Sequence, residues 1–229
     1  MRCAALALAA LAQTVSAATI AIDVGHYREE PGVISARGRP EFEFNLDLAH
    51  VIADALQARG YATRLVGAEG RMQDLALRPR AAAGADLFVS VHHDSVRERF
   101  LKPWTVNGVQ RRYSDRFAGF SLFVSRESPG VKRALACASA IGAALIKAGF
   151  RPSLYHADPV LGENRPFADR AHGVHYFDHL AILRHAVMPA LLFEAGVIVN
   201  REEEFKMSDR NVQELIAASV ADGVAACLR

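Results

Sequence analysis

The sequence is poor in cysteine and has no large excess of charge of either sign. It contains three cysteines among 229 residues, and 27 lysines and arginines stand against 25 aspartates and glutamates. Three cysteines are too few for the disulfide framework of a small secreted domain. Because there is no basic run, nothing indicates a nucleic acid as partner. The chain also contains neither an HExxH motif nor paired CxxC motifs, so no short motif by itself identifies a metal site.

Internal repeats and low-complexity linkers are missing too, and beyond its first residues the chain has no apolar stretch long enough to span a bilayer. With 51% hydrophobic and 23% charged residues it belongs to neither the disordered nor the fibrous proteins. Its length suits one domain with a sizeable core, or one domain with insertions. The composition therefore predicts a single globular domain.

Residues 1–18 predict a secretory signal peptide rather than a part of the fold. Arg2 supplies a short positive region, residues 4–11 form an apolar run, and the small residues 15–18 offer a cleavage site. The segment is too short for a membrane anchor, and a buried first helix is the alternative. We therefore expect an exported mature domain, residues 19–229, in the periplasm, with the extracellular medium as the alternative location and no stable membrane insertion.

Cleavage at this site removes Cys3 and leaves Cys137 and Cys227, both within helical patterns. Export permits a disulfide between them. Two separate buried thiols are the alternative, and the sequence does not decide between the two.

Predicted strands and helices alternate along the mature chain. Short apolar runs predict strands at 19–24, 62–66, 87–91, 119–125, 180–183 and 190–193, and amphipathic or capped stretches predict helices beginning at 41, 75, 128, 202 and 211. This alternation predicts an α/β fold, a single domain with a mainly parallel twisted sheet flanked by helices. Residues 96–118 and 150–179 show no sustained period and are predicted to be loop insertions, the first a surface loop or lid over the site.

Three predicted strands end on polar side chains. The run at 87–91 leads into His92, His93 and Asp94, the run at 19–24 leads into Gly25 and His26, and the run at 190–193 leads into Glu194. Open α/β sheets place their sites at the carboxyl ends of strands. We therefore expect these three strand ends to meet over one metal ion.

A catalytic zinc site takes three ligands from His, Asp and Glu and leaves one position open for water. His26, Glu41 and His92 could supply these ligands, with Glu41 at the start of the first predicted helix. The helix dipole also favours a carboxylate at that position. From spacing alone, Glu41 as a solvent-facing residue remains an alternative.

Four segments occur in an order that resembles a known enzyme family: IAIDVGHYREEPGVIS, EFEFNL, ADLFVSVHHDS and MPALLFEAGVIVN. They are similar to the zinc-dependent N-acetylmuramoyl-L-alanine amidases of the AmiC type, amidase family 3, over about residues 19–228. The resemblance implies that His26, Glu41 and His92 bind one Zn²⁺ per chain and that Glu194 is catalytic. His93 and Asp94 depart from the Ala and Asn that commonly follow in this family.

The resemblance implies hydrolysis of the amide between N-acetylmuramic acid and L-alanine of peptidoglycan, with a zinc-bound water as nucleophile and Glu194 as general base. The alternatives are a catalytically silent cell-wall binding protein on the same fold and a zinc peptidase that acts on another amide. Peptidoglycan is then the partner of a monomeric enzyme, and whether an activator protein is required stays open. For His93, a role in steering a ligand and a role as a hydrogen-bonded loop residue are equally compatible with the sequence.

Overall fold

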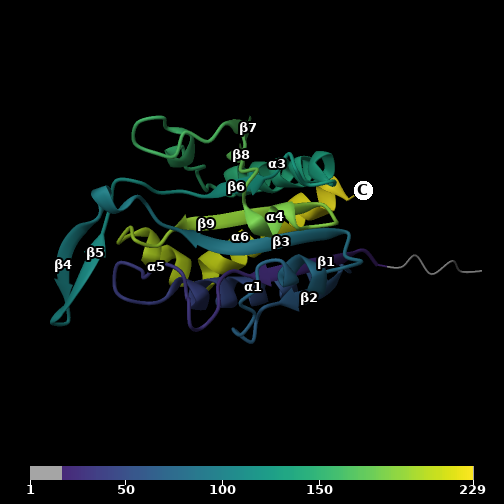
Figure 1. Ribbon diagram of the computed structural model, residues 1–229. Coiled ribbons are helices and arrows are strands. Elements are labelled where there is room, and N and C mark those ends of the chain that lie inside the picture. Colours follow the sequence, from purple (N-terminus) through teal and green to yellow (C-terminus); the bar gives the residue numbers. More distant parts are fainter. Residues whose placement is uncertain (1–16, 229) are drawn as a thin grey trace, which may run out of the picture.

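The computed structural model describes residues 17–228, so residues 1–16 of the predicted signal peptide lie outside the described part of the chain. Within that part, seven strands form one mixed sheet in the order β2-β1-β3-β9-β6-β8-β7 (Figure 1). The strands are β1 (Thr19–Val24), β2 (Ala62–Val66), β3 (Leu87–Asp94), β6 (Ser121–Val124), β7 (Phe167–Asp169), β8 (Val174–Tyr176) and β9 (Ala190–Val197). The helices are α1 (Glu41–Gln57), α2 (Leu77–Ala81), α3 (Val131–Lys147), α4 (Ala181–Arg184), α5 (Glu203–Ser208) and α6 (Arg210–Cys227).

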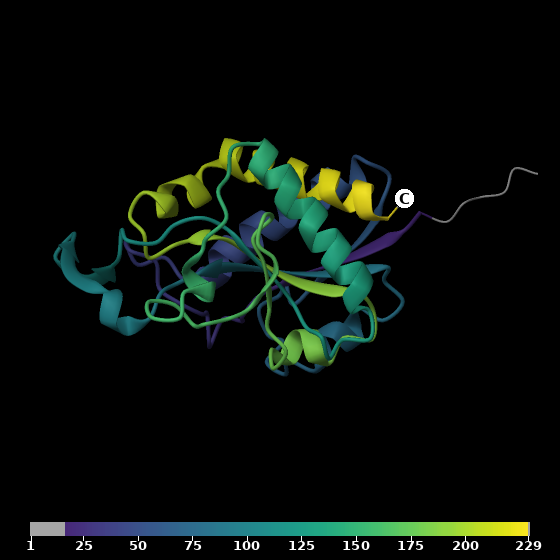
Figure 2. The ribbon, with the colours of Figure 1, turned by 90° about the horizontal axis from the view of Figure 1, so that it is seen from above.

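Helices cover both faces of the sheet. Figure 2 shows α3 and α6 on one side of the sheet and α4 on the other. Alternate residues of each central strand enter the two cores, as the two-residue repeat of a strand requires. In β3, Leu87 and Val89 pack in the larger core with α1, α3 and α6, whereas Phe88 packs in the smaller core with α4. Burial on both faces explains why the central strands read as continuous apolar runs.

Strand directions confirm the predicted α/β fold with a mostly parallel sheet. β2, β1, β3 and β9 run parallel to one another. β6 pairs antiparallel with β9 and parallel with β8, and β7 pairs antiparallel with β8. The carboxyl ends of β1, β3 and β9 therefore lie together at one edge of the sheet, where the sequence places His26, His92 and Glu194.

The segment 96–118 differs from the predicted irregular loop. It contains a 3₁₀ helix (Glu98–Phe100) and a two-stranded hairpin of β4 (Lys102–Val106) and β5 (Val109–Tyr113). Asn107 and Gly108 form the turn with φ angles of 50° and 76°. An Asn-Gly pair is a strong signal for a tight hairpin turn, and the high charge of the flanking residues hides it from a search for apolar periodicity.

Three further features differ from the predictions. Residues 180–183 were predicted as a strand, but α4 occupies this stretch. An apolar run of four residues is too short for its period to distinguish a strand from a helical turn. The predicted loop 150–179 contributes β7 and β8 to the edge of the sheet, and α3 begins at Val131 rather than next to Ser128.

A disulfide joins Cys137 in α3 to Cys227 in α6, with their Cα atoms 5.0 Å apart. It links two helices on the same face of the sheet. Of the two possibilities that the sequence left open, the structure has the disulfide and not two separate buried thiols. Among residues 17–228, no helix combines the length and the apolar character that crossing a membrane requires.

Candidate metal centre

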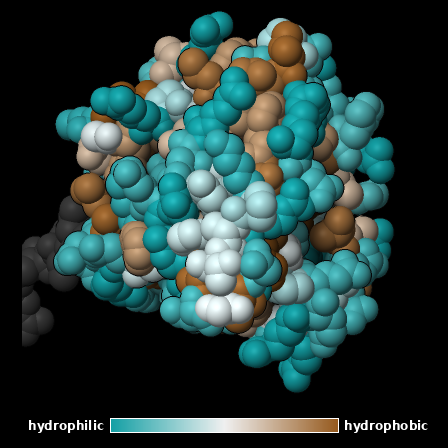
Figure 3. Space-filling view, turned by 90° about the vertical axis from the view of Figure 1, so that its left-hand side faces the viewer, coloured by the Kyte–Doolittle hydropathy of each residue, from teal (hydrophilic) through white to brown (hydrophobic). Residues whose placement is uncertain are grey.

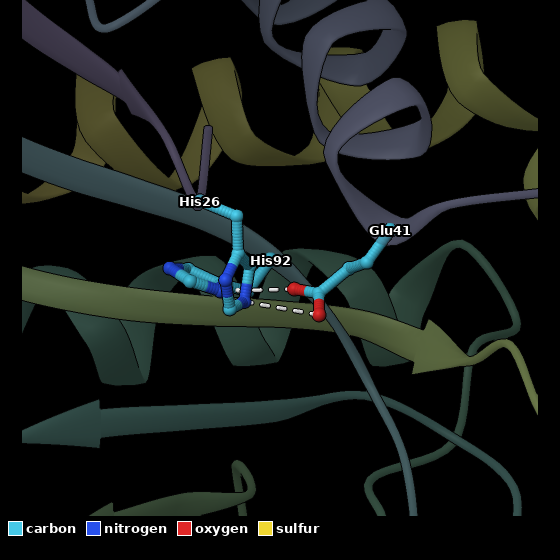
Figure 4. A group of neighbouring side chains, drawn as sticks. All are labelled: His26, Glu41 and His92. Carbon is cyan, nitrogen blue, oxygen red and sulfur yellow. Dashed lines mark hydrogen bonds and ion pairs between the residues drawn. The ribbon is translucent and has the colours of Figure 1, made fainter. Parts of the chain in front are cut away.

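The side chains of His26, Glu41 and His92 converge at the carboxyl edge of the sheet (Figure 4). His26 lies two residues beyond β1, Glu41 is the first residue of α1, and His92 lies near the end of β3. One ligand atom from each residue falls within 4.8 Å of the others. The Nε2 atom of His26 lies 3.0 Å from Oε2 of Glu41, and Nδ1 of His92 lies 3.0 Å from Oε1 of Glu41. The structure thus brings together three side chains that are far apart in the sequence.

Glu41 is the buried centre of this group, with 3% of its surface exposed. Its Oε2 accepts a hydrogen bond from the Val33 amide at 3.1 Å, and its Oε1 accepts one from the Asn45 side chain at 3.2 Å. Burial raises the pKa of Glu41, but hydrogen bonds and charges from the two histidines outweigh it and hold the pKa below its ordinary value. Glu41 is therefore an ionised, buried carboxylate and not a solvent-facing residue. Glu43, the other acidic residue in this turn, is exposed and pairs with Arg39.

His93 supports the site from behind. Its Nδ1 lies 2.8 Å from Oδ1 of Asn45, and its backbone amide donates to Oε1 of Glu41 at 3.3 Å. An amide oxygen only accepts, so Nδ1 of His93 carries the proton. Burial lowers the pKa of His93 to about 3, so its ring is neutral. His93 thus orients Asn45, and Asn45 orients Glu41.

Arg78, which the sequence placed only in a short helix, holds the turn that carries His26. The guanidinium donates to the backbone carbonyls of Val24, His26 and Met72, and it pairs with Asp23 at 2.8 Å. Arg78 and Asp23 have side-chain exposures of 1% and 0%. His26 has a φ of 67°, which is uncommon for a residue other than glycine. The buried guanidinium therefore stabilises a strained backbone at a ligand position.

Glu194 shares a cavity with the three ligands. It lies opposite His92 in the β3–β9 register. Its Oε2 atom is buried and has no hydrogen-bond partner among residues 17–228. Burial, followed by the charges of Asp94, Glu41 and Glu163, raises the pKa of Glu194 well above its ordinary value. A cation held by the neighbouring ligands would lower this pKa again.

A second buried ionic group forms one wall of this cavity. His156 lies with Nε2 2.6 Å from Oδ2 of Asp94 and Nδ1 3.1 Å from Oε2 of Glu163. Burial lowers the pKa of His156, but the two carboxylates outweigh it and raise the pKa to about 9. Arg165 donates to Glu163 at 2.5 Å, and the hydrogen bond and charge of His156, followed by those of Arg165, outweigh burial and lower the pKa of Glu163 to about 2. Because this group joins β3 to the segment 150–179, spacing in the sequence gave no signal for it.

The donor set fits zinc. Two histidine nitrogens and one carboxylate make up a known ligand set of catalytic zinc sites. With metal–ligand distances of about 2.0–2.2 Å, tetrahedral ligand atoms lie about 3–4 Å apart. The 3.0 Å contacts of Glu41 with His26 and His92 are close to this separation. The buried Oε2 of Glu194 without a partner in the described structure is a further fit, because a proton-accepting carboxylate next to the ligands requires a free oxygen.

Comparisons with known proteins identify the family and the fold of the chain. The family model described as N-acetylmuramoyl-L-alanine amidase matches residues 20–226. An amidase of that name from Clostridium difficile 630 is similar, with a TM-score of 0.71 and 21% identity over 93% of this chain and 97% of that chain. Ami1 from Mycobacterium smegmatis is similar, with a TM-score of 0.72 and 18% identity over 92% of this chain and 96% of that chain. The CwlV catalytic domain from Bacillus (Paenibacillus) polymyxa var. colistinus is also similar, with a TM-score of 0.69 and 23% identity over 92% of this chain and 98% of that chain. A comparison with curated proteins finds no match.

Proposed function

The chain belongs to the N-acetylmuramoyl-L-alanine amidase family, and we propose that it is an exported, zinc-dependent member in which Glu194 acts as general base. The observation that carries this proposal is the convergence of His26, Glu41 and His92 within 4.8 Å. Glu194 lines the same cavity. The three ligands leave a fourth position for water, and the carboxylate beside them has a free oxygen.

Different residues of this chain would bind the zinc and transfer the proton during amide hydrolysis. His26, Glu41 and His92 would hold the zinc, which supplies a Lewis acid that lowers the pKa of a coordinated water and polarises the scissile carbonyl. Glu194 accepts the proton of the attacking water at Oε2. It then delivers that proton to the leaving amine of L-alanine, which completes the cleavage.

The two alternative functions, a silent cell-wall binding protein and a zinc peptidase, are not equally well supported by the site. A silent cell-wall binding protein would need no base beside the ligands, and all four positions are filled here. A zinc peptidase would use the same four residues, so only the products of hydrolysis separate it from the amidase. The family assignment favours the muramoyl amide as the bond that is cleaved.

The family assignment also supports the proposed export and the proposed partner, peptidoglycan. Peptidoglycan lies outside the cytoplasmic membrane, and the Cys137–Cys227 disulfide is typical of oxidising compartments. We therefore place the mature enzyme in the periplasm, with the extracellular medium as the alternative. The related amidase CwlD from Clostridioides difficile was solved in complex with the GerS lipoprotein. A protein partner is accordingly a second component to test, whereas the catalytic chain itself is proposed to be a monomer.

The deciding experiment measures zinc and products together. The purified protein is analysed for zinc per chain and incubated with purified peptidoglycan, with and without a chelator. We expect one zinc per chain and free stem peptides with an L-alanine amino terminus, and we expect both to be lost on chelation. Zinc without any product would point to a missing activator or to another amide substrate. A chain that binds no zinc would contradict the proposal.

The role of Glu194 is tested by Glu194→Gln, which keeps the shape of the side chain and removes its basicity. We expect kcat to fall by about 10²–10⁴-fold, the usual contribution of a general base. Zinc content should stay at one per chain, because Glu194 is not a ligand. Glu43→Gln is the matched control, since Glu43 is an exposed carboxylate in the same turn as Glu41, and its rate should equal that of the wild type. An unchanged rate in Glu194→Gln would show that another group is the base.

A further inference from the structure

The hairpin of β4 and β5 projects from the edge of the sheet that carries the metal centre (Figure 1). Residues 97–116 contain six basic and two acidic residues, although the whole chain has a formal charge of only +2. Figure 3 shows that the face bearing this hairpin is mostly hydrophilic. Cationic charge is thus concentrated beside the site.

Three of these cations line one cavity of about 610 Å³ at the base of the hairpin. They are Arg99, Lys102 and Arg116, and none of them has a carboxylate within 4.0 Å among residues 17–228. Arg99 donates to the carbonyls of Val160 and Leu161, which leave its charge uncompensated.

The acidic residues close to this cavity already have partners. Asp115 lines the cavity but is held by Arg201 through Nε and Nη2. Asp158 lies within electrostatic range of Arg116, and its carboxylate accepts hydrogen bonds from two backbone amides of its own loop. The cavity therefore keeps an excess of positive charge.

Aromatic rings connect this cavity to the metal centre. Phe100 lines the cationic cavity, and its ring centroid lies 5.2 Å from that of Phe117. Phe117 in turn lies 4.6 Å from Tyr155, which lines the cavity of the metal centre. The Tyr155 hydroxyl accepts a hydrogen bond from the Arg97 amide at 2.8 Å, which fixes the chain between the two cavities. Two ring contacts thus separate the two cavities.

We propose that the cavity lined by Arg99, Lys102 and Arg116 binds a carboxylate of the peptide stem whose amide is cleaved at the metal centre. The inference rests on the proposed function. An extended peptide advances about 3.3–3.6 Å per residue, so a carboxylate three residues beyond the scissile amide lies about 10 Å from it. The two centroid steps of 5.2 Å and 4.6 Å between Phe100 and Tyr155 are of the same order as this reach. Guanidinium and ammonium groups are the usual partners of carboxylates.

The test compares two stem peptides that differ only in a free or an amidated carboxyl terminus. Their binding to the purified protein is measured by calorimetry, and hydrolysis of the corresponding muropeptides gives kcat and KM. Wild type should prefer the free acid. In the double variant Lys102→Gln, Arg116→Gln this preference should shrink by about fivefold, since each exposed charge pair contributes at most about 1 kcal/mol. The loss should fall on KM and on the peptide Kd, with kcat unchanged.

The matched control is Lys132→Gln, Arg133→Gln, which removes the same charge from the exposed start of α3. This control should keep the wild-type preference, which separates a local site from a general charge effect. Equal preference for acid over amide in the wild type and in the hairpin variant would overturn the inference. Peptide binding is read without turnover, so a wild-type protein that binds the acid selectively but binds no zinc and cleaves no muropeptide would contradict the proposed function and leave the carboxylate site standing.

Discussion

Single residues around the metal centre have unequal roles that their positions in the sequence do not reveal. His26 has a positive φ and needs an external support, and Arg78 supplies it by binding carbonyls on both sides of Gly25. The guanidinium itself is neutralised by Asp23, whose second oxygen accepts a hydrogen bond from Ser90 at 2.6 Å. The position of His26 therefore depends on the buried network of Arg78, Asp23 and Ser90.

Replacing Arg78 should therefore weaken zinc binding without touching a ligand. We expect Arg78→Met to raise the Kd for zinc by about 10- to 100-fold, the usual effect of losing a group that orients a ligand. The variant also leaves Asp23 buried without its partner, so it should unfold at a lower temperature. Zinc titration with a competing chelator, well below the unfolding temperature, measures the effect.

Arg80→Met is the control, because Arg80 is an exposed residue of the same short helix. Its zinc affinity should match that of the wild type. Arg78→Lys restores a buried cation but not the fork of donors, so it separates charge from geometry. If Arg78→Met and Arg78→Lys both bound zinc as tightly as the wild type, the turn at His26 would not depend on this side chain.

At the scale of elements, the segment between α3 and β7 is attached to the end of β3 through His156. Both ring nitrogens of His156 contact carboxylates, Asp94 on β3 and Glu163 within the segment itself. This attachment also places Tyr155 in the wall of the metal-centre cavity. The segment is thus a fixed wall rather than an unattached loop, and the attachment depends on pH.

The sign of that dependence follows from the two pKa shifts. The pKa of His156 is raised to about 9, above about 6.5 for an unfolded histidine, so its stabilisation is complete below pH 6.5 and is lost as the pH rises through 9. The pKa of Glu163 is lowered to about 2, so its contribution is present above its unfolded value and is lost as the pH falls through 2. The attachment is strongest between about pH 4.5 and 6.5.

We expect the stability advantage of the wild type over His156→Gln to fall by about 2 kcal/mol between about pH 7 and pH 9.5. Denaturant unfolding of both proteins at the two pH values measures it. Taking the difference between the two proteins removes the titration of other groups, such as His175, whose pKa burial lowers to about 4. His179→Gln is the control, since that side chain is 83% exposed. An advantage that stays constant with pH would mean that His156 is not protonated in the folded protein.

At the scale of the whole molecule, the Cys137–Cys227 disulfide links two residues that are 90 positions apart in the sequence. Those residues include the segment 150–179, α4, β9, α5 and the whole of α6, so the bond restrains a large part of the chain in the unfolded state. Cys227 is the last residue of α6, and this end of the chain lies at the opposite end of the molecule from the hairpin of β4 and β5 (Figure 1), away from the metal centre. Its effect should therefore fall on stability and not on chemistry.

The double variant Cys137→Ser, Cys227→Ser should lose about 2–4 kcal/mol of unfolding free energy, the usual contribution of a native disulfide. Its zinc content and kcat should equal those of the wild type at a temperature where both are folded. Wild-type protein treated with a reductant should show the same loss, and a thiol assay confirms the redox state. Equal unfolding midpoints for oxidised and reduced protein would contradict the prediction.

The sequence by itself determined the features that depend on neighbours along the chain. Apolar runs predicted six strands, five of which form, and polar residues at the strand ends predicted where the site lies. The ordered motifs selected Glu41 from two nearby glutamates, because each motif is a continuous stretch. The α/β class followed from the alternation of these patterns alone.

Only the tertiary structure decided the features that depend on which distant segments meet. Arg78 and His26 are separated by 52 positions, and His156 and Asp94 by 62. The sequence pattern holds no period that would pair such residues, because the order of strands in the sheet sets their contact. The disulfide partner and the aromatic link from Phe100 to Tyr155 have the same origin. The ordered motifs thus pointed to the candidate ligands, whereas long-range packing decided which groups hold these side chains in place.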